Sequence, residues 1–313
     1  MQWSERIGRR IKLRDLHILS EVVQSGSMAK AAKGLAVSTP VVSKTIADLE
    51  QSVGVRLLDR SARGIEATMY GRALLRWSIA AFDDLRQGIK EIEFLADPTA
   101  GELRIGCPTS MMEGFLPVIL NRLHRHHPRL IFDVTQTFTG APLHRELRER
   151  SVDLILGLMM TPIADDFSAE VLFDEPQFVL AGVQNKWVRR RHIELAELIN
   201  EPWILPKPGT ATRAVIAETF RACNLEVPSA VISCNSVQMY RTLLASGPWL
   251  GILGTSALRF GAKRPAIKVL PVKLPALPWP VGIITLKGRM ISPVAQLFID
   301  YAREVAKPLA KGK

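Results

Sequence analysis

Short polar side chains and one cation face outward from a helix that the sequence predicts from about residue 39. Ser38 is a favourable N-cap, and Pro40 falls in the first helical turn, where its missing N–H costs no intrahelical bond. Val42, Ile46 and Leu49 recur at helical spacing and are expected to face a core. The residues between them include hydroxyls and a lysine, which can reach base edges and phosphates in a major groove. This chemistry predicts binding to double-stranded DNA.

The residues around this helix predict a helix-turn-helix over residues 27–54. An earlier helix over residues 13–24 carries leucines and valines on its buried side, and Gly26 ends it. Ala31 and Ala32 are small enough for two helices to cross closely. Because any three-helix module can show this spacing, the interpretation depends on the residues on its carboxyl-terminal side.

The sequence that continues beyond the helix-turn-helix matches the pattern of one family. Residues 31–64 read AAKGLAVSTPVVSKTIADLEQSVGVRLLDRSARG, and a long helical pattern begins after Thr68. This stretch resembles the DNA-binding domain of the LysR-type transcriptional regulators, whose pattern runs AA..L..SQPAVS..I..LE..LG..LF.R..R. Thr39 stands where the family usually has Gln, and Lys44 where it often has Arg. Both lie on the expected reading face, so they bear on the operator sequence more than on the fold.

The resemblance implies a winged helix-turn-helix over residues 1–68, with residues 56–68 as a two-stranded wing. Arg60 can either contact the DNA backbone or pair with Asp59, and the sequence leaves both roles open. The basic arm before residue 13 is likewise a solvated tail or a phosphate contact. The expected DNA-contacting residues are Ser27, Ser38, Thr39, Pro40, Val41, Ser43, Lys44, Arg60 and Arg63.

A long helical pattern over residues 69–96 comes after the wing. Its apolar residues fall on the a and d positions of a heptad, namely Leu75, Phe82, Leu85, Ile89 and Ile92. The helix could pack on its own domain, but a small module offers little to cover so long a stripe. We therefore predict a linker helix that forms a homodimer, and the resemblance implies a homotetramer.

The chain beyond residue 101 alternates short apolar runs with amphipathic segments, as in an α/β domain with parallel strands. Two such series predict an effector-binding domain over residues 101–313. Its first lobe is expected at residues 101–176 and 267–306, and its second at residues 177–266. The order resembles the family's effector domain, which shares its two-lobed α/β fold with periplasmic binding proteins.

Loops that come after strands in both series are expected to meet at a cleft between the lobes. Hydroxyls and free N–H groups in these loops can hold an anionic or hydroxylated ligand. For any one residue, a role as N-cap or turn former is an equal alternative. The expected effector-contacting residues, taken from the family-like positions, are Thr109, Ser110, Met111, Thr139, Gly140, Lys207, Gly209 and Ser236.

Composition limits the remaining classes of function. The 313 residues carry a net charge of +11, which favours a polyanionic partner. Three cysteines lack CxxC spacing, and neither a secretory signal nor a membrane-length apolar run is present, so we expect a cytoplasmic protein. His124, His126 and His127 end an amphipathic helix without other ligands at metal spacing. No catalytic motif is found, and we predict no enzyme, cofactor or metal site.

The sequence thus predicts a LysR-like transcription regulator whose operator binding responds to a small molecule. Two alternatives belong to other classes. A solute-binding protein would account for the last two-thirds of the chain but not for the reading helix. A constitutive nucleoid-type DNA binder would show neither ligand response nor operator preference.

Overall fold

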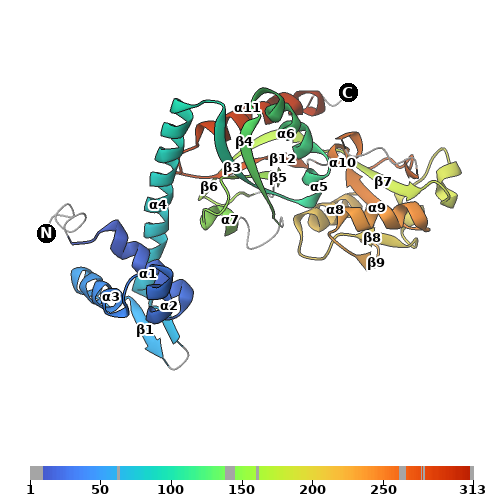
Figure 1. Ribbon diagram of the computed structural model, residues 1–313. Coiled ribbons are helices and arrows are strands. Elements are labelled where there is room, and N and C mark those ends of the chain that lie inside the picture. Colours follow the sequence, from blue (N-terminus) through green and yellow to red (C-terminus); the bar gives the residue numbers. More distant parts are fainter. Residues whose placement is uncertain are drawn as a thin grey trace. The chain divides into compact units, whose positions relative to one another are not determined.

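The computed structural model describes residues 10–61, 64–137, 145–159, 162–260, 266–275, 277 and 279–310. It separates into two compact units, Met1–Arg86 and Gln87–Lys313. The first holds the winged helix-turn-helix and the second the α/β domain (Figure 1).

The first unit consists of three helices, a two-stranded ribbon and the start of a long helix. Their bounds are α1 (Leu13–Ser25), α2 (Met28–Gly34), α3 (Thr39–Val53), β1 (Leu58–Ser61), β2 (Gly64–Ala67) and α4 (Met69–Ala96). The antiparallel β1–β2 pair is the expected wing. Gly26 ends α1 in the left-handed conformation with φ 65°, which glycine adopts without strain.

The core of this unit has the predicted helical spacing. Val42, Ile46 and Leu49 of α3 are buried, and Ala31 and Ala32 lie beneath them where α2 crosses. The outward residues of α3 are thereby fixed, because a helix that buries one stripe must expose the opposite one.

Helix α4 differs in part from the predicted heptad. Leu75 and Phe82 are partly buried against the core of the first unit, and the Phe82 ring lies 6.2 Å from the ring of His17. Leu85, Ile89 and Ile92 are exposed by 51%, 57% and 68%. The uncovered stripe therefore begins at Leu85 and runs towards the end of the helix.

The second unit contains two five-stranded sheets. The first has the order β4-β3-β5-β12-β6, in which β3, β4 and β5 are parallel and β12 is antiparallel to both β5 and β6. Its strands are β3 (Ala100–Cys107), β4 (Arg129–Gln136), β5 (Leu154–Leu158), β6 (Phe167–Asp174) and β12 (Pro280–Leu286). Its helices are α5 (Thr109–Met112), α6 (Phe115–His126), α7 (Arg145–Arg148) and α11 (Pro293–Ala310).

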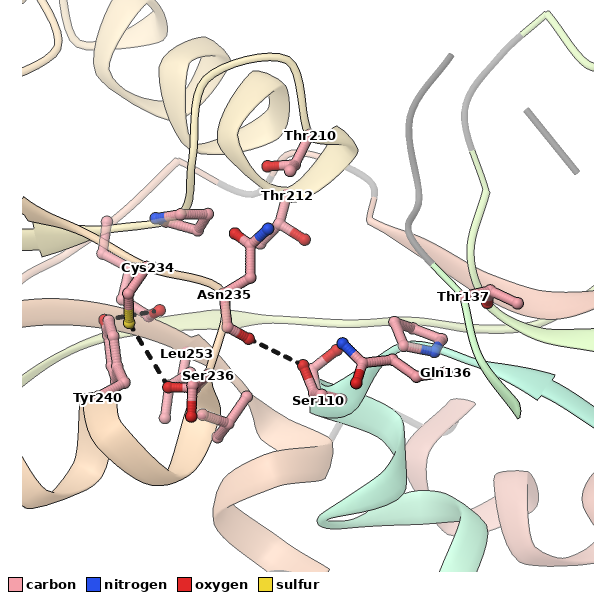
Figure 2. Close-up of a pocket in the computed structure, with 15 residues that line it drawn as sticks. Ser110, Gln136, Thr137, Thr210, Thr212, Cys234, Asn235, Ser236, Tyr240 and Leu253 are labelled. Atoms are coloured by element: carbon pink, nitrogen blue, oxygen red, sulfur yellow. Dashed lines mark hydrogen bonds between the residues drawn. The ribbon is translucent and has the colours of Figure 1, made fainter. Parts of the chain in front are cut away.

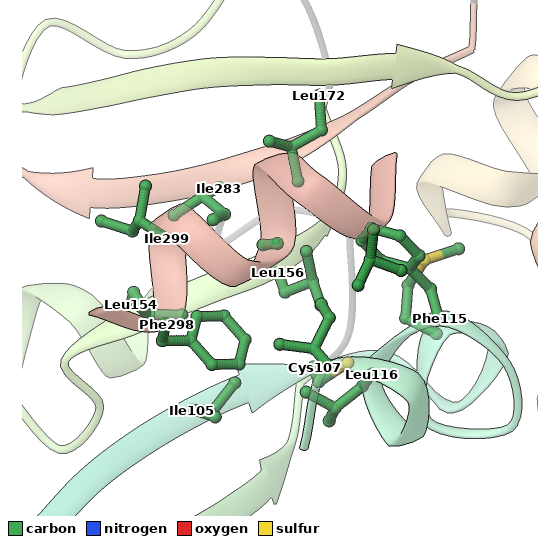
Figure 3. Close-up of a cluster of buried hydrophobic side chains, with 14 of the residues drawn as sticks. Ile105, Cys107, Phe115, Leu116, Leu154, Leu156, Leu172, Ile283, Phe298 and Ile299 are labelled. Carbon is green, nitrogen blue, oxygen red and sulfur yellow. The ribbon is translucent and has the colours of Figure 1, made fainter. Parts of the chain in front are cut away.

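The main core of this lobe lies between the first sheet and two helices, α6 and α11. Phe115 of α6 and Phe298 of α11 are fully buried against Ile105 of β3 and Leu156 of β5 (Figure 3). Burial of this apolar surface, at about 25 cal/mol per Å², fixes the register of β3 and hence the position of the loop after it.

The second lobe contains the other sheet, of order β11-β7-β10-β8-β9, in which β8, β9 and β10 are parallel and β7 is antiparallel to its neighbours. Its strands are β7 (Gln177–Gly182), β8 (Trp203–Leu205), β9 (Ala230–Ser233), β10 (Leu250–Gly254) and β11 (Ile267–Val269). Its helices are η2 (Lys186–Arg189), η3 (Leu195–Leu198), α8 (Ala211–Ala222), α9 (Val237–Ser246) and α10 (Thr255–Phe260). Helices α8 and α9 pack on opposite faces, since they belong to separate apolar clusters.

The predicted return to the first lobe at residue 267 is wrong. Strand β11 pairs with β7 in the second sheet, through Ile267 opposite Gly182 and Val269 opposite Leu180. The chain enters the first sheet again only with β12. None of the described helices has the length and apolar character needed to cross a bilayer.

Candidate functional site

The outward face of α3 presents the predicted polar set. Thr39, Val41 and Lys44 are exposed, and Ser43 is partly exposed. Ser38 occupies the N-cap position as predicted, but its hydroxyl makes no bond to the first turn. An exposed hydroxyl beside the free N–H groups of a helix start is suited to a phosphate oxygen.

The turn into α3 holds strained backbone. Ala36 adopts φ 54°, a left-handed conformation that costs a non-glycine residue roughly 1–2 kcal/mol. Ser27 begins α2 instead, where its hydroxyl accepts the N–H of Lys30 at 3.5 Å. Ser27 is thus engaged as an N-cap, while Pro40 lies exposed in the first turn of α3.

The wing is held by a side chain of α3. The carboxylate oxygen of Glu50 accepts the N–H groups of Leu57 at 2.7 Å and of Leu58 at 3.2 Å. Arg60 is exposed and forms no ion pair with any residue that the structure describes, including Asp59. Arg63 lies outside the described residues.

A cavity of about 90 Å³ lies at the boundary of the two lobes in the second unit (Figure 2). It opens at the carboxyl ends of strands from both sheets, as expected for α/β folds. Its lining residues are Pro108, Thr109, Ser110, Gln136, Thr137, Pro206, Thr210, Thr212, Cys234, Asn235, Ser236, Val237, Tyr240, Ile252 and Leu253.

The predicted effector-contacting residues divide into three groups. Thr109, Ser110 and Ser236 line this cavity. Met111, Lys207 and Gly209 do not: Met111 is 2% exposed within the core, and the other two lie exposed on the turn before α8. The remaining two, Thr139 and Gly140, lie outside the described residues.

Several lining residues were missed by the sequence reasoning. Gln136 ends β4 and Thr137 comes directly after it, while Thr212 lies in the first turn of α8 and Asn235 just before α9. The signal that could have found them is their place directly after a strand or at a helix start. Tyr240 carried no such signal, because a single aromatic residue on a helix is an ordinary core residue.

The two lobes are joined beside the cavity by side chains of α5 and α9. The Thr109 hydroxyl donates to the carbonyl of Asn235 at 3.0 Å. Glu113, just after α5, lies 3.4 Å from the guanidinium of Arg241 on α9. Arg241, which is 5% exposed, also donates to the carbonyl of Ala257 at 2.6 Å. The wall of the cavity and the contact between the lobes are thus built from the same short elements.

Burial shifts the pKa values of three titratable groups near the cavity towards their neutral forms. Burial raises the pKa of the Tyr240 phenol, whose hydroxyl donates to the carbonyl of Ile252 at 3.0 Å. Burial also raises the pKa of the Glu175 carboxyl, which accepts the N–H of Ser256 at 2.7 Å. Burial likewise raises the pKa of the Cys107 thiol. These groups bring little negative charge to the cavity.

A reading helix in one unit and a ligand-sized cavity in the other define a ligand-binding DNA-binding protein. A family model described as "Bacterial regulatory helix-turn-helix protein, lysR family" matches residues 13–72, and one described as "LysR substrate binding domain" matches residues 96–307. The chain therefore belongs to the LysR family. It is a DNA-binding transcriptional regulator with an effector-binding domain.

Relatives match this chain over most of its length. The uncharacterized HTH-type transcriptional regulator YybE of Bacillus subtilis is 30% identical over 88% of this chain and 92% of its own. The transcriptional dual regulator GltC of the same organism is 26% identical over 93% and 96%. These proteins are similar to this chain in sequence over nearly their full length.

Solved structures have the same fold. Full-length OxyR from Pseudomonas aeruginosa matches with a TM-score of 0.71 at 23% identity, over 97% of this chain and 99% of that one. The LysR family regulator CbnR matches with a TM-score of 0.65 at 20% identity, over 95% and 99%.

Proposed function

We propose that this regulator works in the cytoplasm as a homo-oligomer whose binding to an operator changes when a small molecule occupies the cavity between its lobes. The observation that carries the proposal is the cavity itself. It is lined from both lobes, and its walls include Thr109 and Asn235, which bond to each other across the boundary. A ligand there contacts both lobes and therefore binds one lobe arrangement better than another.

The deciding experiment pairs operator selection with ligand screening. Full-length protein selects its operator from genomic fragments, and mobility-shift titrations then measure affinity with and without small acids, sugars and amino acids. We expect at least one compound to change operator affinity and to protect the second unit from thermal unfolding. A constitutive DNA binder would retain the same affinity with every compound.

The proposed DNA contacts come from α3 and the wing. Ser43 and Lys44 face the groove, and Ser38 and Arg60 reach the backbone. Replacing Ser43 by Glu adds a negative charge at the DNA surface and should abolish measurable operator binding. Gln51→Glu adds the same charge near the far end of α3 and serves as the matched control. Equal losses in both variants would show a general charge effect and not a reading face.

The proposed dimer uses the exposed stripe of α4. Leu85, Ile89 and Ile92 leave an apolar surface uncovered that a second copy of the helix would bury. Ile89→Asp places a charge in that surface and should convert the dimer to monomer in sedimentation experiments. Trp77→Asp, which changes an exposed apolar residue outside the a and d positions, should leave the dimer intact. A tetramer would add a second kind of contact between dimers.

A further inference from the structure

The cavity offers hydrogen-bonding groups without ionised side chains. Hydroxyls, two amides, a thiol and apolar residues make up its lining, and no Asp, Glu, Lys, Arg or His lines it within the described chain. The ligand is therefore recognised by oriented dipoles, which favour a small polar molecule over a large apolar one.

The first lobe contributes two hydroxyls for which no hydrogen-bond partner is found among the described residues. Thr137 is 3% exposed, and its Oγ1 atom is buried without a hydrogen-bond partner. An orphaned buried hydroxyl costs about 1–3 kcal/mol unless something bonds to it. The hydroxyl of Ser110 at the start of α5 also lines the cavity, whereas that of its neighbour Thr109 is engaged by Asn235. Thr137 thus indicates a missing oxygen or nitrogen partner in the cavity.

The second lobe contributes the first turns of two full-length helices. Thr210 caps α8 by accepting the N–H of Arg213, and Ser236 caps α9 by accepting the N–H of Met239. These caps leave the earlier N–H groups of each turn, including that of Thr212, to bond outside the helix. Both helix starts line one cavity, so their positive dipole ends add there.

The residue after Thr212 is a cation. Arg213 comes after Thr212 in the first turn of α8, and its Nη1 atom is buried without a hydrogen-bond partner. Burial lowers the pKa of its guanidinium, as expected for a cation short of a counter-charge. The first turns of α8 and α9 therefore contribute positive partial charge to the cavity.

The volume sets an upper limit on the ligand. A cavity of roughly 150 Å³ holds benzene, with its six ring carbons. By the same ratio, the volume of about 90 Å³ found in this protein encloses roughly four non-hydrogen atoms, so the ligand must be small.

We propose that the effector is a small hydroxy- or keto-monocarboxylate of two or three carbons, with its carboxylate at the first turns of α8 and α9 and its second oxygen at Ser110 and Thr137. This inference rests on the proposed function, because it names the ligand class of the same cavity. A neutral diol fits less well. The unused groups of the second lobe are N–H donors, which an anionic acceptor satisfies with stronger, charge-assisted bonds.

The test measures binding of glycolate, L-lactate and pyruvate to the full-length protein by calorimetry and thermal shift. The amides glycolamide and L-lactamide keep the size and remove the charge, and benzoate keeps the charge and exceeds the volume. We expect at least one of the three acids to bind, its amide to bind at least tenfold more weakly, and benzoate not to bind.

Two variants locate the bound acid. Thr137→Val keeps the shape of the side chain and removes its hydroxyl. It should lower the affinity for the acid by about tenfold. Thr242→Val makes the same change on the exposed side of α9, outside the cavity lining, and should leave the affinity unchanged. If Thr137→Val fails to fold, Ser110→Ala provides the same test from the start of α5.

The outcomes separate the ligand class from the site. If an amide bound more tightly than its acid and Thr137→Val weakened that binding, the ligand would not be an anion. The cavity would still be the binding site. Binding of an acid that neither Thr137→Val nor Ser110→Ala weakens would overturn the cavity as well. Binding of none of the three acids would overturn the inference, while a response of operator binding to any other compound would still support the proposed function.

Discussion

Replacing Asp153 by Asn should destabilise the effector unit more than any surface substitution. The residue is 8% exposed, accepts hydrogen bonds from two arginines and forms an ion pair with one lysine. Arg104 donates at 2.6 Å from its guanidinium and at 2.9 Å from its backbone, Arg289 donates at 2.7 Å, and the Lys90 ammonium lies 3.7 Å away. Because Lys90 belongs to α4, this carboxylate ties the end of the linker helix to the sheet.

The expected loss of unfolding free energy in Asp153→Asn follows from the burial of these charged groups. Removing one member of a buried ion pair costs about 3–5 kcal/mol, because the remaining charge stays buried without that counter-charge. Asn keeps the volume and one acceptor, and Arg289 keeps its bond to the carbonyl of Val152, so we expect about 3 kcal/mol. Asp300→Asn on α11 breaks a pair whose side chains are 53% and 44% exposed and should cost under about 0.5 kcal/mol.

Urea unfolding of the full chain measures both variants, with hydrogen exchange at β3 and β5 identifying the transition of this unit. Burial alone would raise the pKa of Asp153, but the bonds from Arg104 and the charge of Lys90 together lower it. A lowered folded pKa gives stability above the carboxyl's unfolded value of about 3.9, and this stability is lost as the pH falls through the folded pKa. The difference between wild type and Asp153→Asn should therefore shrink in acid. An Asn variant as stable as wild type at neutral pH would refute this account of the network.

Three further predictions concern the backbone and one buried acid. Ala36→Gly should raise the free energy of unfolding of the first unit by about 1 kcal/mol, as glycine relieves the positive φ; a lower melting temperature would contradict this. Gly114→Ala should lower the stability of the second unit by about 2 kcal/mol, since the new Cβ would meet the carbonyl oxygen of Ser256 at 2.4 Å; unchanged urea unfolding would show that the lobes separate freely there. Burial raises the pKa of Glu175, so its contribution to stability is full below its unfolded pKa and is lost as the pH rises through the folded value. Glu175→Gln should therefore lack this loss of stability at higher pH. Identical pH profiles of unfolding free energy for wild type and variant would contradict this role of Glu175.

Features of the fold with a local signal were predictable from the sequence. The buried stripe of α3 and the glycine end of α1 depend only on helical period and on the conformational freedom of one residue. Strand β6 carries no alternating signal in the sequence, because its buried residues do not alternate and its pairing with β12 shifts register between Val281 and Gly282. The lobe boundary was misplaced because β11 is a short, largely exposed edge strand, and nothing in its residues selects one sheet over the other.

The candidate site was predictable as loops but not as side chains. Ser110 and Ser236 were found because each lies at a helix start, a feature that is visible in the sequence. Thr137 could not be distinguished from any other polar residue at a strand end. Its importance arises from packing that buries its hydroxyl without a partner, which depends on both sheets being in place.

The unused donors also limit how strongly a ligand can control DNA binding. Ser110 and Thr137 belong to the first lobe and Thr212 to the second, so a ligand that bonds to all three loses some of these bonds when the lobes rearrange. Two or three hydrogen bonds at about 1 kcal/mol each give a differential affinity of roughly 2–3 kcal/mol between lobe arrangements. By linkage, operator affinity can change by no more than the same amount, or about 30–150-fold. Under the proposed function, the effector changes operator affinity by a limited amount, and we expect salt-dependent contacts of α3 and the wing to supply most of that affinity.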